Sequence, residues 1–590
     1  MMTPLAATPL QTKGGAFLIE DREPSEVFTA EDLTEEHHAI ARTVDQFWAN
    51  DVEPQLEAIR QHTPGVALEV LRKSAELGLT AIPIPERFGG MEMDLPSVMI
   101  AGEHLAKDTS YGSWHSAHTG IGTLPVLFFG NEEQKRKYLP KLAKAELLAA
   151  YALTEPLAGS DAMSIRTRAD LSSDGKYYVL NGQKMWITNG GAADLFTVFA
   201  KVGGEKFTAF LVERSFSGVS SGAEEHKMGM KGSSTTAVYF DNVRVPVENA
   251  LGEIGRGHII AFNILNIGRL KLGAGAIGAA KRVLATCLKY ASERKAFGTT
   301  IAHFGAIQHK LAEMAIRTYA VEAMTWRVVG LIESQLQQSA HDTAAQPTSE
   351  LKAVEEYAAE CSMIKVYASE ALDYVVDEGV QIHGGYGYHQ DYAVERAYRD
   401  ARINRIFEGT NEINRLLITG MLLKRAARGQ LALIPAVQSV LGGVARAAGP
   451  IGTNEEARLV QNAKKIALFT IGIAYQKYGT ELEQQQEVVM NISDIIMEAF
   501  AMESSLLRSR KLAASSKGKN AADMCSVFLR EAMDRVEVSS RVVVGSCADS
   551  NAVQERMATL RALANYDPVD AIALRRNIAG RLLAAGCYTV

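Results

Sequence analysis

A β-rich stretch, from about residue 151 to 257, interrupts a chain that otherwise follows helical periodicity. Its short runs, such as YYVLNG, KMWITNG and AVYFDNVRVPV, are rich in β-branched and aromatic residues and are separated by glycine-containing turns. Asn181-Gly182 predicts a hairpin turn between Val179 and Trp186. The order helix, strand, helix, helix favours helical bundles around a small antiparallel β unit over a doubly wound parallel sheet.

Proline and glycine punctuation divides the chain into four predicted domains. Thr29-Ala30-Glu31-Asp32 opens the first helical segment, and helical periodicity returns at about Ile259 after the β-rich stretch. Breaks at Pro435 and Gly449-Pro450 introduce a further helical portion. We expect a mainly α chain with an N-terminal helical domain over 1–150, a β-barrel or β-sandwich over 151–258, a four-helix-bundle domain over 259–428 and a C-terminal helical extension over 429–590.

Composition and charge exclude several classes of protein. Hydrophobic residues make up 47% of the chain and charged residues 22%, which excludes a disordered or collagen-like chain. A balance of 62 basic against 68 acidic residues argues against broad nucleic-acid affinity. The start lacks a signal or transit pattern, and no run approaches the ~18 apolar residues of a spanning helix. We therefore expect a soluble cytoplasmic protein without a nucleic-acid partner.

The cysteines point to a reducing compartment. They are few, odd in number and scattered, and they form no C-x-x-C pair. We expect mostly buried thiols at the five positions, which are Cys287, Cys361, Cys525, Cys547 and Cys587.

Some common motifs occur in the wrong context. GAGAIG at 273–278 lies in a helical run without a preceding strand, so it predicts close helix packing instead of a dinucleotide site. GVSSG at 218–222 lies in a turn between β runs with no helix following, which argues against a nucleophile elbow. His37-His38 and the pair His115 and His118 lack the spacing of a metal site, so we expect no metal.

Two segments could bind a flat heterocycle. YALTEPLAGSDA, at 151–162, offers accessible backbone N–H groups and the hydroxyls of Thr154 and Ser160, although its composition alone favours a plain turn. KMWITNGG, at 184–191, places Trp186 and Thr188 on one side of a strand. That pair could stack on a ring system, or it could be ordinary strand core.

A third segment offers a candidate base. RIFEGTNEINRLL, at 405–417, has a buried helix face that begins just after Gly409. Glu408 therefore lies in the entry turn, next to Phe407. It is either a base in an apolar pocket or an ordinary charged loop residue.

Together the three segments resemble the acyl-CoA dehydrogenase family. The runs T-E-P-x-A-G-S-D, W-I-T-N-G and E-G-T-N-E-I are present in the family's order, as are ERKAFG at 293–298 and QIHGGYGY at 381–388. The resemblance extends from about Glu31 to Gly429. The additional C-terminal portion and FGAIQ at 304–308 make the chain most similar to the very-long-chain acyl-CoA dehydrogenase branch, as a bacterial member.

The resemblance implies FAD-dependent oxidation of a fatty acyl-CoA to the trans-2-enoyl-CoA in fatty-acid β-oxidation, with electrons passed to an electron-transfer flavoprotein. Glu408 matches the family's base, which takes a proton from the α-carbon while flavin takes hydride from the β-carbon. Exclusion of water raises the carboxylate pKa, and hydrogen bonds to the thioester carbonyl stabilise the developing enolate. Some branches place the base just before an arginine that resembles Arg269; here Gly268 stands there, which leaves Glu408.

The same resemblance implies the binding residues. The substrate is expected to contact Ser160, Asn266, Arg269 and Gly409. FAD is expected to contact Leu153, Thr154, Gly159, Ser160, Trp186, Ile187, Thr188, Arg294, Phe297, Gln381, Gly384, Gly385, Thr410 and Glu412. A second subunit supplies several of the latter in the family, which implies a homodimer. Most members carry glutamine where Gly305 stands, so one polar flavin contact is missing here.

Chain length and membrane contact follow from two further segments. Ser113 and Ala117 are small residues one turn apart on the helix expected to floor the acyl pocket, which predicts long-chain substrates. The segment at about 429–452 is apolar with few cations, so peripheral contact with the inner membrane and plain helix packing remain equal alternatives. Competing functions are an acyl-CoA oxidase and a non-catalytic binding or assembly member of the superfamily.

Overall fold

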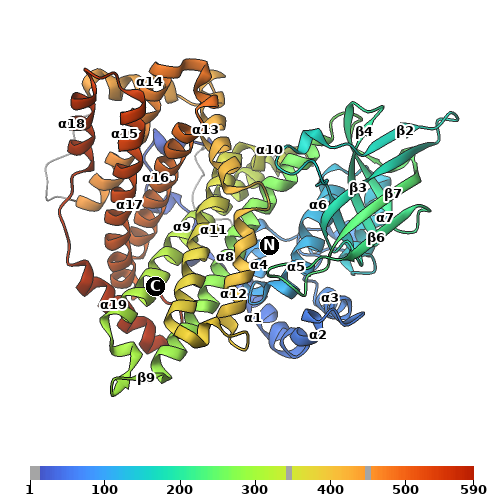
Figure 1. The fold of residues 1–590 in the computed structure, drawn as a ribbon, viewed down its shortest axis with the longest axis horizontal. Helices are drawn as coiled ribbons and strands as arrows, with labels where there is room; N and C mark the ends of the chain where they lie inside the picture. The colour runs from blue at the N-terminus through green and yellow to red at the C-terminus, as the bar shows by residue number, and fades with distance from the viewer. Residues whose placement is uncertain (1–12, 341–347, 445–453) are drawn as a thin grey trace. The chain divides into compact units, whose positions relative to one another are not determined.

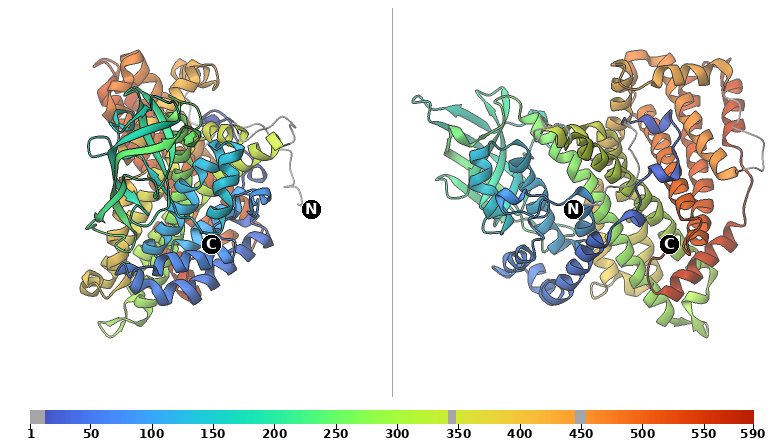
Figure 2. Two further views of the ribbon diagram at one scale, coloured as in Figure 1. Left: turned by 90° about the vertical axis from the view of Figure 1, so that its right-hand side faces the viewer. Right: turned by 180° about the vertical axis from the view of Figure 1, so that it is seen from behind.

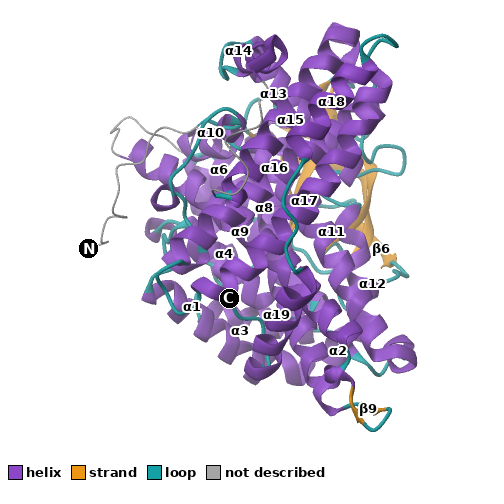
Figure 3. Cartoon of the chain, turned by 90° about the vertical axis from the view of Figure 1, so that its left-hand side faces the viewer, coloured by secondary structure: helices purple, strands orange, loops and turns teal. Residues whose placement is uncertain are grey.

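The computed structural model describes residues 13–340, 348–444 and 454–590, and its helices and strands divide into two compact units. The β unit comprises the described residues of 33–279 and 336–355, and the bundle unit comprises those of 13–32, 280–335 and 356–590. Helices dominate, and strands are confined to one large sheet and the small β9–β10 pair (Figure 3).

The β unit contains an eight-stranded sheet together with the N-terminal helices (Figure 1). The strand order is β6-β7-β3-β2-β4-β5-β8, with β1 pairing beside β4. Most pairings are antiparallel, whereas β4 pairs in parallel with both β1 and β2. The strands are β1 Ala149–Ala152, β2 Arg168–Leu171, β3 Tyr177–Thr188, β4 Leu195–Val202, β5 Lys206–Glu213, β6 Val219–Glu224, β7 Thr235–Pro246 and β8 Ala250–Leu251.

The helices of the β unit precede the sheet and continue after it. They are α1 Glu35–Phe47, α2 Leu56–Arg60, α3 Val66–Glu76, α4 Leu95–Leu105, α5 Thr109–Ala117, α6 Leu124–Phe129, α7 Glu132–Ala143 and α10 Thr348–Glu356, together with the π-helical turn η7 His118–Gly122. The helices α8 Gly257–Glu293 and α9 Gly305–Ala340 have residues in both units.

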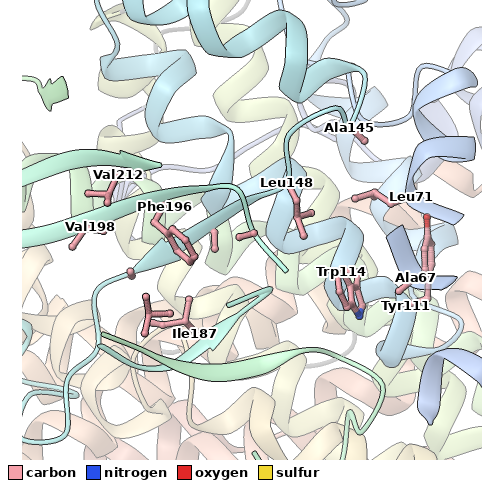
Figure 4. Packing of buried hydrophobic residues seen from close by; sticks show 14 of the residues in the cluster. Ala67, Leu71, Tyr111, Trp114, Ala145, Leu148, Ile187, Phe196, Val198 and Val212 are labelled. Atoms are coloured by element: carbon pink, nitrogen blue, oxygen red, sulfur yellow. The ribbon is translucent and has the colours of Figure 1, made fainter. Parts of the chain in front are cut away.

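One hydrophobic cluster joins these helices to the sheet. Trp114 and Tyr111 of α5 and Leu71 of α3 belong to the same cluster as the strand residues Phe196 and Val198 (Figure 4). All five side chains are buried, and the Trp114 indole also donates to the Gly232 carbonyl over 2.8 Å. The buried polar atom is therefore satisfied within the core.

The bundle unit is helical. Its helices are α11 Ala358–His383, α12 Ala393–Ala401, α13 Asn411–Ala427, α14 Leu433–Ser439, α15 Glu455–Tyr478, α16 Gln486–Leu512, α17 Gly518–Cys547, α18 Val553–Ala564 and α19 Ala571–Ala585, with the short strands β9 Lys295–Ala296 and β10 Thr299–Thr300. The N-terminal segment lies beside the C-terminal helices (Figure 2), where Lys464 donates to the Glu20 carbonyl over 2.8 Å. In the described part of the chain, no helix combines the length and apolar character that crossing a bilayer demands.

The mainly α architecture with a central β domain and a helical extension is confirmed, whereas the four domain boundaries remain predictions. The first helix starts later than expected: Ala30–Asp32 is a 3₁₀ turn, and α1 begins after Thr34, whose hydroxyl accepts from the His37 N–H. Cys287, Cys361, Cys525 and Cys547 are buried, whereas Cys587 is exposed. The break predicted at Gly449-Pro450 lies outside the described residues.

The predicted Asn181-Gly182 hairpin is wrong. β3 continues through both residues and pairs with β7 on either side of a bulge. The Cβ that a side chain would add at Gly182 would lie 2.5 Å from the Thr167 hydroxyl, so this glycine permits close strand approach. The chain instead reverses at Asp174-Gly175, where Gly175 has a φ of 68° and the Ser172 N–H donates to the Tyr177 carbonyl.

The two misplaced glycine motifs have structural explanations. GAGAIG lies within α8, and a Cβ at Gly278 would meet the Glu103 carbonyl of α4 at 2.0 Å, which confirms close helix packing. GVSSG does not form the turn we expected. Ser220 instead lies on β6, paired with Tyr239, and no helix follows it, so the motif forms no nucleophile elbow.

Candidate active site

Glu408 lies in a tight turn immediately before α13. Its φ is 58° and that of Gly409 is 80°, so two successive residues adopt the left-handed conformation. Thr410 then caps the helix, because its hydroxyl accepts from the Ile413 N–H over 3.3 Å. A left-handed glutamate is uncommon and costs free energy, and such residues concentrate at functional sites.

Buried donors fix this turn by holding its carbonyl groups. The Asn414 side-chain amide donates to the carbonyls of Glu408, Gly409 and Thr410 over 3.3, 2.8 and 3.1 Å. The Lys365 ammonium donates to the Gly409 carbonyl over 2.7 Å. Both side chains are fully buried. The half-buried Glu408 is therefore held at a defined place by its main chain.

A further layer of hydrogen bonds ties the turn to the C-terminal extension. Asn411 donates to Glu370 over 3.0 Å, and Glu370 accepts two bonds from Arg415 over 2.7 and 2.9 Å. The same guanidinium donates to Asp494 of α16 over 2.7 Å. The extension thus supports the helix that follows the candidate base.

In the β unit, the first two predicted segments lie side by side. The Met185 N–H donates to the Thr154 carbonyl over 2.9 Å. The buried Lys184 ammonium donates to the Leu153 carbonyl over 3.0 Å and to the Glu155 carboxylate over 2.7 Å. Burial lowers the pKa of Lys184 to about 8 although Glu155 opposes that shift. A buried ion pair therefore joins the loop to strand β3.

Trp186 projects from a bulge in β3. Its φ is 57°, and the register with β7 shifts between Lys184 and Ile187. The indole is 61% exposed, whereas Ile187 belongs to the core and Thr188 is half-buried. In a regular strand, successive side chains alternate between the two faces of the sheet. The bulge interrupts this alternation and leaves the large aromatic face of Trp186 exposed.

The glycine-containing loop before this strand is open. Gly159 and Ser160 are exposed, and a Cβ at Gly159 would meet nothing within 4 Å. Backbone groups here are accessible to a ligand.

Asn266 and Arg269 lie together on α8. Both are buried, and the Arg269 guanidinium donates to the Asn266 side-chain oxygen over 2.8 Å. Arg269 is thus not a surface residue. Its charge lies in a desolvated position, where a cation interacts strongly with a ligand anion.

The remaining predicted flavin residues lie in the bundle unit and are exposed. Phe297, in the β9–β10 hairpin, has a φ of 53° and is 96% exposed, and the Arg294 guanidinium lies 5.3 Å from the Tyr386 ring centre. Gln381, Gly384 and Gly385 are exposed at the end of α11, and a Cβ at either glycine would meet nothing within 4 Å. Glu412 lies at the start of α13, where backbone N–H groups lower its pKa.

Sequence reasoning missed the residues that hold the site residues in place. Lys365 and Asn414 form hydrogen bonds that hold the Glu408 turn in place. The Lys184–Glu155 ion pair does the same for the strand that contains Trp186. The motif runs quoted above include Asn414, Lys184 and Glu155. No local pattern in the sequence distinguishes a buried supporting residue from a solvent-exposed one. Lys365 is in a helical run and had no signal at all.

Comparison with known proteins identifies the family. The models for the acyl-CoA dehydrogenase N-terminal, middle and C-terminal domains match residues 34–146, 150–243 and 255–423, and a further acyl-CoA dehydrogenase C-terminal domain model matches 462–562. A probable acyl-CoA dehydrogenase of Bacillus subtilis is 46% identical over 585 residues, which cover 98% of each chain. The chain belongs to the acyl-CoA dehydrogenase family.

Two more relatives indicate the branch and the cofactor. The human mitochondrial very long-chain specific acyl-CoA dehydrogenase is 42% identical over 394 residues, covering 63% of this chain and 57% of that protein. The structure of an acyl-CoA dehydrogenase from Bacillus anthracis complexed with FAD is 45% identical, with a TM-score of 0.96 over 98% of this chain and 100% of that one. The chain is an FAD-dependent enzyme of this family.

The residues present fit this cofactor. The exposed indole of Trp186 offers a face for a flat ring, and the open backbone at Gly159 offers N–H groups. In the bundle unit, Arg294 offers a cation for phosphate, and the exposed Phe297 ring offers a surface for a base.

Proposed function

We propose that the protein oxidises long-chain fatty acyl-CoA to the trans-2-enoyl-CoA in fatty-acid β-oxidation, with Glu408 as the base and an electron-transfer flavoprotein as acceptor. The observation that carries the proposal is the left-handed Glu408 held by buried donors to its own turn. When bound, FAD supplies the two-electron oxidant that accepts hydride from the β-carbon. Glu408 takes the proton from the α-carbon, so one C–H bond breaks at each carbon and the double bond forms.

The other side chains bind and orient the reactants. Glu408 contributes its peptide N–H to the thioester carbonyl, and Ser160 and Gly409 line the substrate path. Arg269, with Asn266, places positive charge toward the CoA-proximal part of the substrate. Trp186 would exclude water from one side of the flavin ring. Removal of water from the Glu408 carboxylate raises its pKa, so that it is basic enough to remove a carbon-bound proton.

We propose that the following residues bind the flavin. From the β unit we assign Leu153, Thr154, Gly159, Ser160, Trp186, Ile187 and Thr188. From the bundle unit we assign Thr410 and Glu412, and, supplied by a second subunit, Arg294, Phe297, Gln381, Gly384 and Gly385. The exposure of this last group supports a homodimer, the commonest oligomer. Sedimentation of the purified holoenzyme measures the oligomeric state.

Long-chain preference rests on small residues of α5. Ala117 is buried, and the Ser113 hydroxyl donates to the Thr109 carbonyl over 2.6 Å, so this helix face presents little polar surface. Each buried CH₂ contributes about 0.8 kcal/mol, so the preference is graded. We expect kcat/KM to rise from octanoyl-CoA to palmitoyl-CoA.

The test of the base is anaerobic mixing of the holoenzyme with palmitoyl-CoA. We expect the flavin band to bleach in the wild type, and we expect Glu408→Gln to slow bleaching at least about a hundredfold with FAD still bound. Glu481→Gln, which alters an exposed carboxylate, is the matched control and should bleach at the wild-type rate. Undiminished bleaching by Glu408→Gln would refute the assignment.

The same preparation separates the competing functions. An oxidase turns over in air without an added acceptor and releases hydrogen peroxide, whereas a dehydrogenase requires the flavoprotein acceptor. A non-catalytic binding or assembly member gives no bleaching with any acyl-CoA. Possession of Glu408 and a net charge of −6 disfavour a DNA-associating member.

Localisation is proposed to be cytoplasmic, with the stretch at 429–452 as the candidate for peripheral membrane contact. In its described part, Ile434 of α14 is 52% exposed while Leu433 is buried. Residues 445–452 of this stretch lie outside the described residues. Co-sedimentation with anionic vesicles, compared between the wild type and Ile434→Ser, distinguishes membrane contact from plain helix packing.

A further inference from the structure

An arginine of the C-terminal extension lies over a glycine next to the proposed flavin residues. Gly305 begins α9, and a Cβ added there would lie 3.5 Å from Nη2 and 4.0 Å from Nε of Arg576. Arg576 belongs to α19, which lies near the β9–β10 hairpin in the bundle unit (Figure 1). The guanidinium therefore approaches the place where a side chain at position 305 would begin.

Arg576 is available to bind an anion. It is exposed, and in the described part of the chain it forms no ion pair. Its neighbour Arg575 contrasts with it, because that guanidinium is buried and bonded to Glu313 over 2.7 Å and also to Glu531. α19 is therefore anchored by one arginine and presents the next to solvent.

The surroundings of Arg576 have the chemistry of a nucleotide site. Phe304, adjacent to Gly305, stacks edge-on against the exposed Phe297 with ring centres 6.0 Å apart. Arg294, at the other end of the same hairpin, lies over Tyr386, which follows the open Gly384-Gly385 pair. Guanidinium groups bind phosphates, exposed rings stack on bases, and open glycines admit a ligand close to the backbone.

We infer that Arg576 contacts the nucleotide portion of the FAD held by a second copy of the chain, and that it replaces the glutamine that most family members carry at position 305. This inference rests on the proposed function, which assigns the same surface to the second subunit. It adds a cofactor residue from the C-terminal extension, a part of the chain to which no flavin contact was assigned. The extension then has a binding role in addition to packing.

The test is FAD affinity, measured by titrating apoprotein with FAD and following flavin fluorescence. We expect Arg576→Ala to raise the Kd about tenfold, because it removes a charge-assisted contact. Arg576→Lys should lose less, and the salt dependence of binding should weaken in Arg576→Ala. The matched control is Arg561→Ala, an exposed arginine on α18, and it should leave the Kd unchanged. The KM for palmitoyl-CoA at saturating FAD should not move.

Restoring the family's glutamine gives a second readout. We expect Gly305→Gln to recover part of the lost FAD affinity in the Arg576→Ala background, where the space is open. Gly305 has no left-handed φ, so the backbone accepts a side chain there. Unchanged affinity in Arg576→Ala together with weakened affinity in Arg294→Ala would overturn the inference and leave the proposed function standing.

Two other outcomes would also overturn the inference about Arg576. Unchanged affinity in both Arg576→Ala and Arg294→Ala would overturn the assignment of this whole surface to FAD. A shift of Arg576→Ala to monomers in sedimentation, with FAD lost as a consequence, would show that the arginine acts through assembly and would likewise overturn the inference.

Discussion

At the scale of single residues, three candidate site residues share an uncommon backbone conformation. Trp186, Phe297 and Glu408 have φ angles of 57°, 53° and 58°. None of these residue types favours the left-handed region, which costs about 1 kcal/mol or more for a side chain larger than glycine. Motif spacing selected these three residues as candidates. It could not predict this conformation, because the groups that enforce it, such as Asn414 and Lys365, act through folded contacts.

The Glu408 turn gives a prediction about Asn414. Replacing Asn414 by Asp keeps the shape but puts an acceptor where an amide now donates to three carbonyls. We expect a loss of about 3 kcal/mol in the free energy of unfolding by urea, because the site is buried. We also expect slower flavin bleaching by palmitoyl-CoA at unchanged FAD content, because Glu408 moves.

The control for Asn414 is Asn404, whose amide donates to one carbonyl, that of Ala401, over 3.1 Å from a less buried position. Asn404→Asp should cost about 1 kcal/mol or less and leave bleaching unchanged. Equal urea midpoints for the wild type and Asn414→Asp would contradict the supporting role of this amide.

At the scale of elements, the sequence predicted the existence of the β domain well and its turns less well. Asn181-Gly182 and Asp174-Gly175 carry the same local turn signal, and only the second forms a turn. At Gly182 the chain stays extended because β7 pairs on both sides and Thr167 approaches closely. Such tertiary pairing overrides a dipeptide preference and cannot be read locally.

The junction between the turn η7 and strand β1 gives a pH prediction. His118 is buried; its Nδ1 accepts from the Ala149 N–H over 3.2 Å, so Nε2 is the atom that donates to the Leu142 carbonyl over 3.0 Å. Protonation of the His118 ring at Nδ1 would place a second N–H group against the Ala149 N–H. Burial, with smaller opposing and assisting contributions from Leu142 and Lys271, lowers the pKa of His118 to about 4.

The direction of the change in stability with pH follows from which state of the chain binds the proton. Between pH 6.5 and about 4 the unfolded chain binds a proton at His118 that the folded chain does not, so stability falls as the pH falls. From pH 8 to pH 5 we expect this residue to cost about 2 kcal/mol. His118→Gln, which can make both hydrogen bonds without titrating, should remove that part of the pH dependence in urea titrations. The exposed His389→Gln should not, and equal pH slopes for the two variants would contradict the argument.

At the scale of the whole molecule, composition and motif order predicted the sequence of helical and β portions. They could not predict how the ends of the chain pack. Arg508 of α16 contacts Glu31 over 2.8 Å and Glu322 over 2.5 Å, and the Tyr588 hydroxyl donates to Glu322 over 3.0 Å. These groups come from the N-terminal segment, α9, the extension and the C-terminal residues. Because hundreds of positions separate them, no window of sequence contains the pattern.

This buried cluster carries the last prediction. Although burial alone would raise it, Arg508 and then Lys281 hold the pKa of Glu322 down to about 2. Arg508→Met removes the cation that Glu31 and Glu322 share and leaves Lys281 as the remaining cation beside Glu322, so we expect a loss of about 3 kcal/mol in the free energy of unfolding at pH 7. Arg510→Met is the control, because that half-buried arginine on the same helix bonds only to Asn454 over 2.7 Å among the described residues. It should cost under about 1 kcal/mol.

A double variant tests whether the loss of stability in Arg508→Met comes from the charge of Glu322. Adding Glu322→Gln to Arg508→Met removes one of the two carboxylates that have lost Arg508, so the double variant should regain part of the lost stability. The wild type should also lose stability as the pH falls from about 4.5 toward 2, because the unfolded chain then binds a proton at Glu322 that the folded chain does not, and the double variant should lose less. Equal urea midpoints for Arg508→Met and Arg510→Met would contradict the role of Arg508, since the two ends of the chain would then be held without its charge.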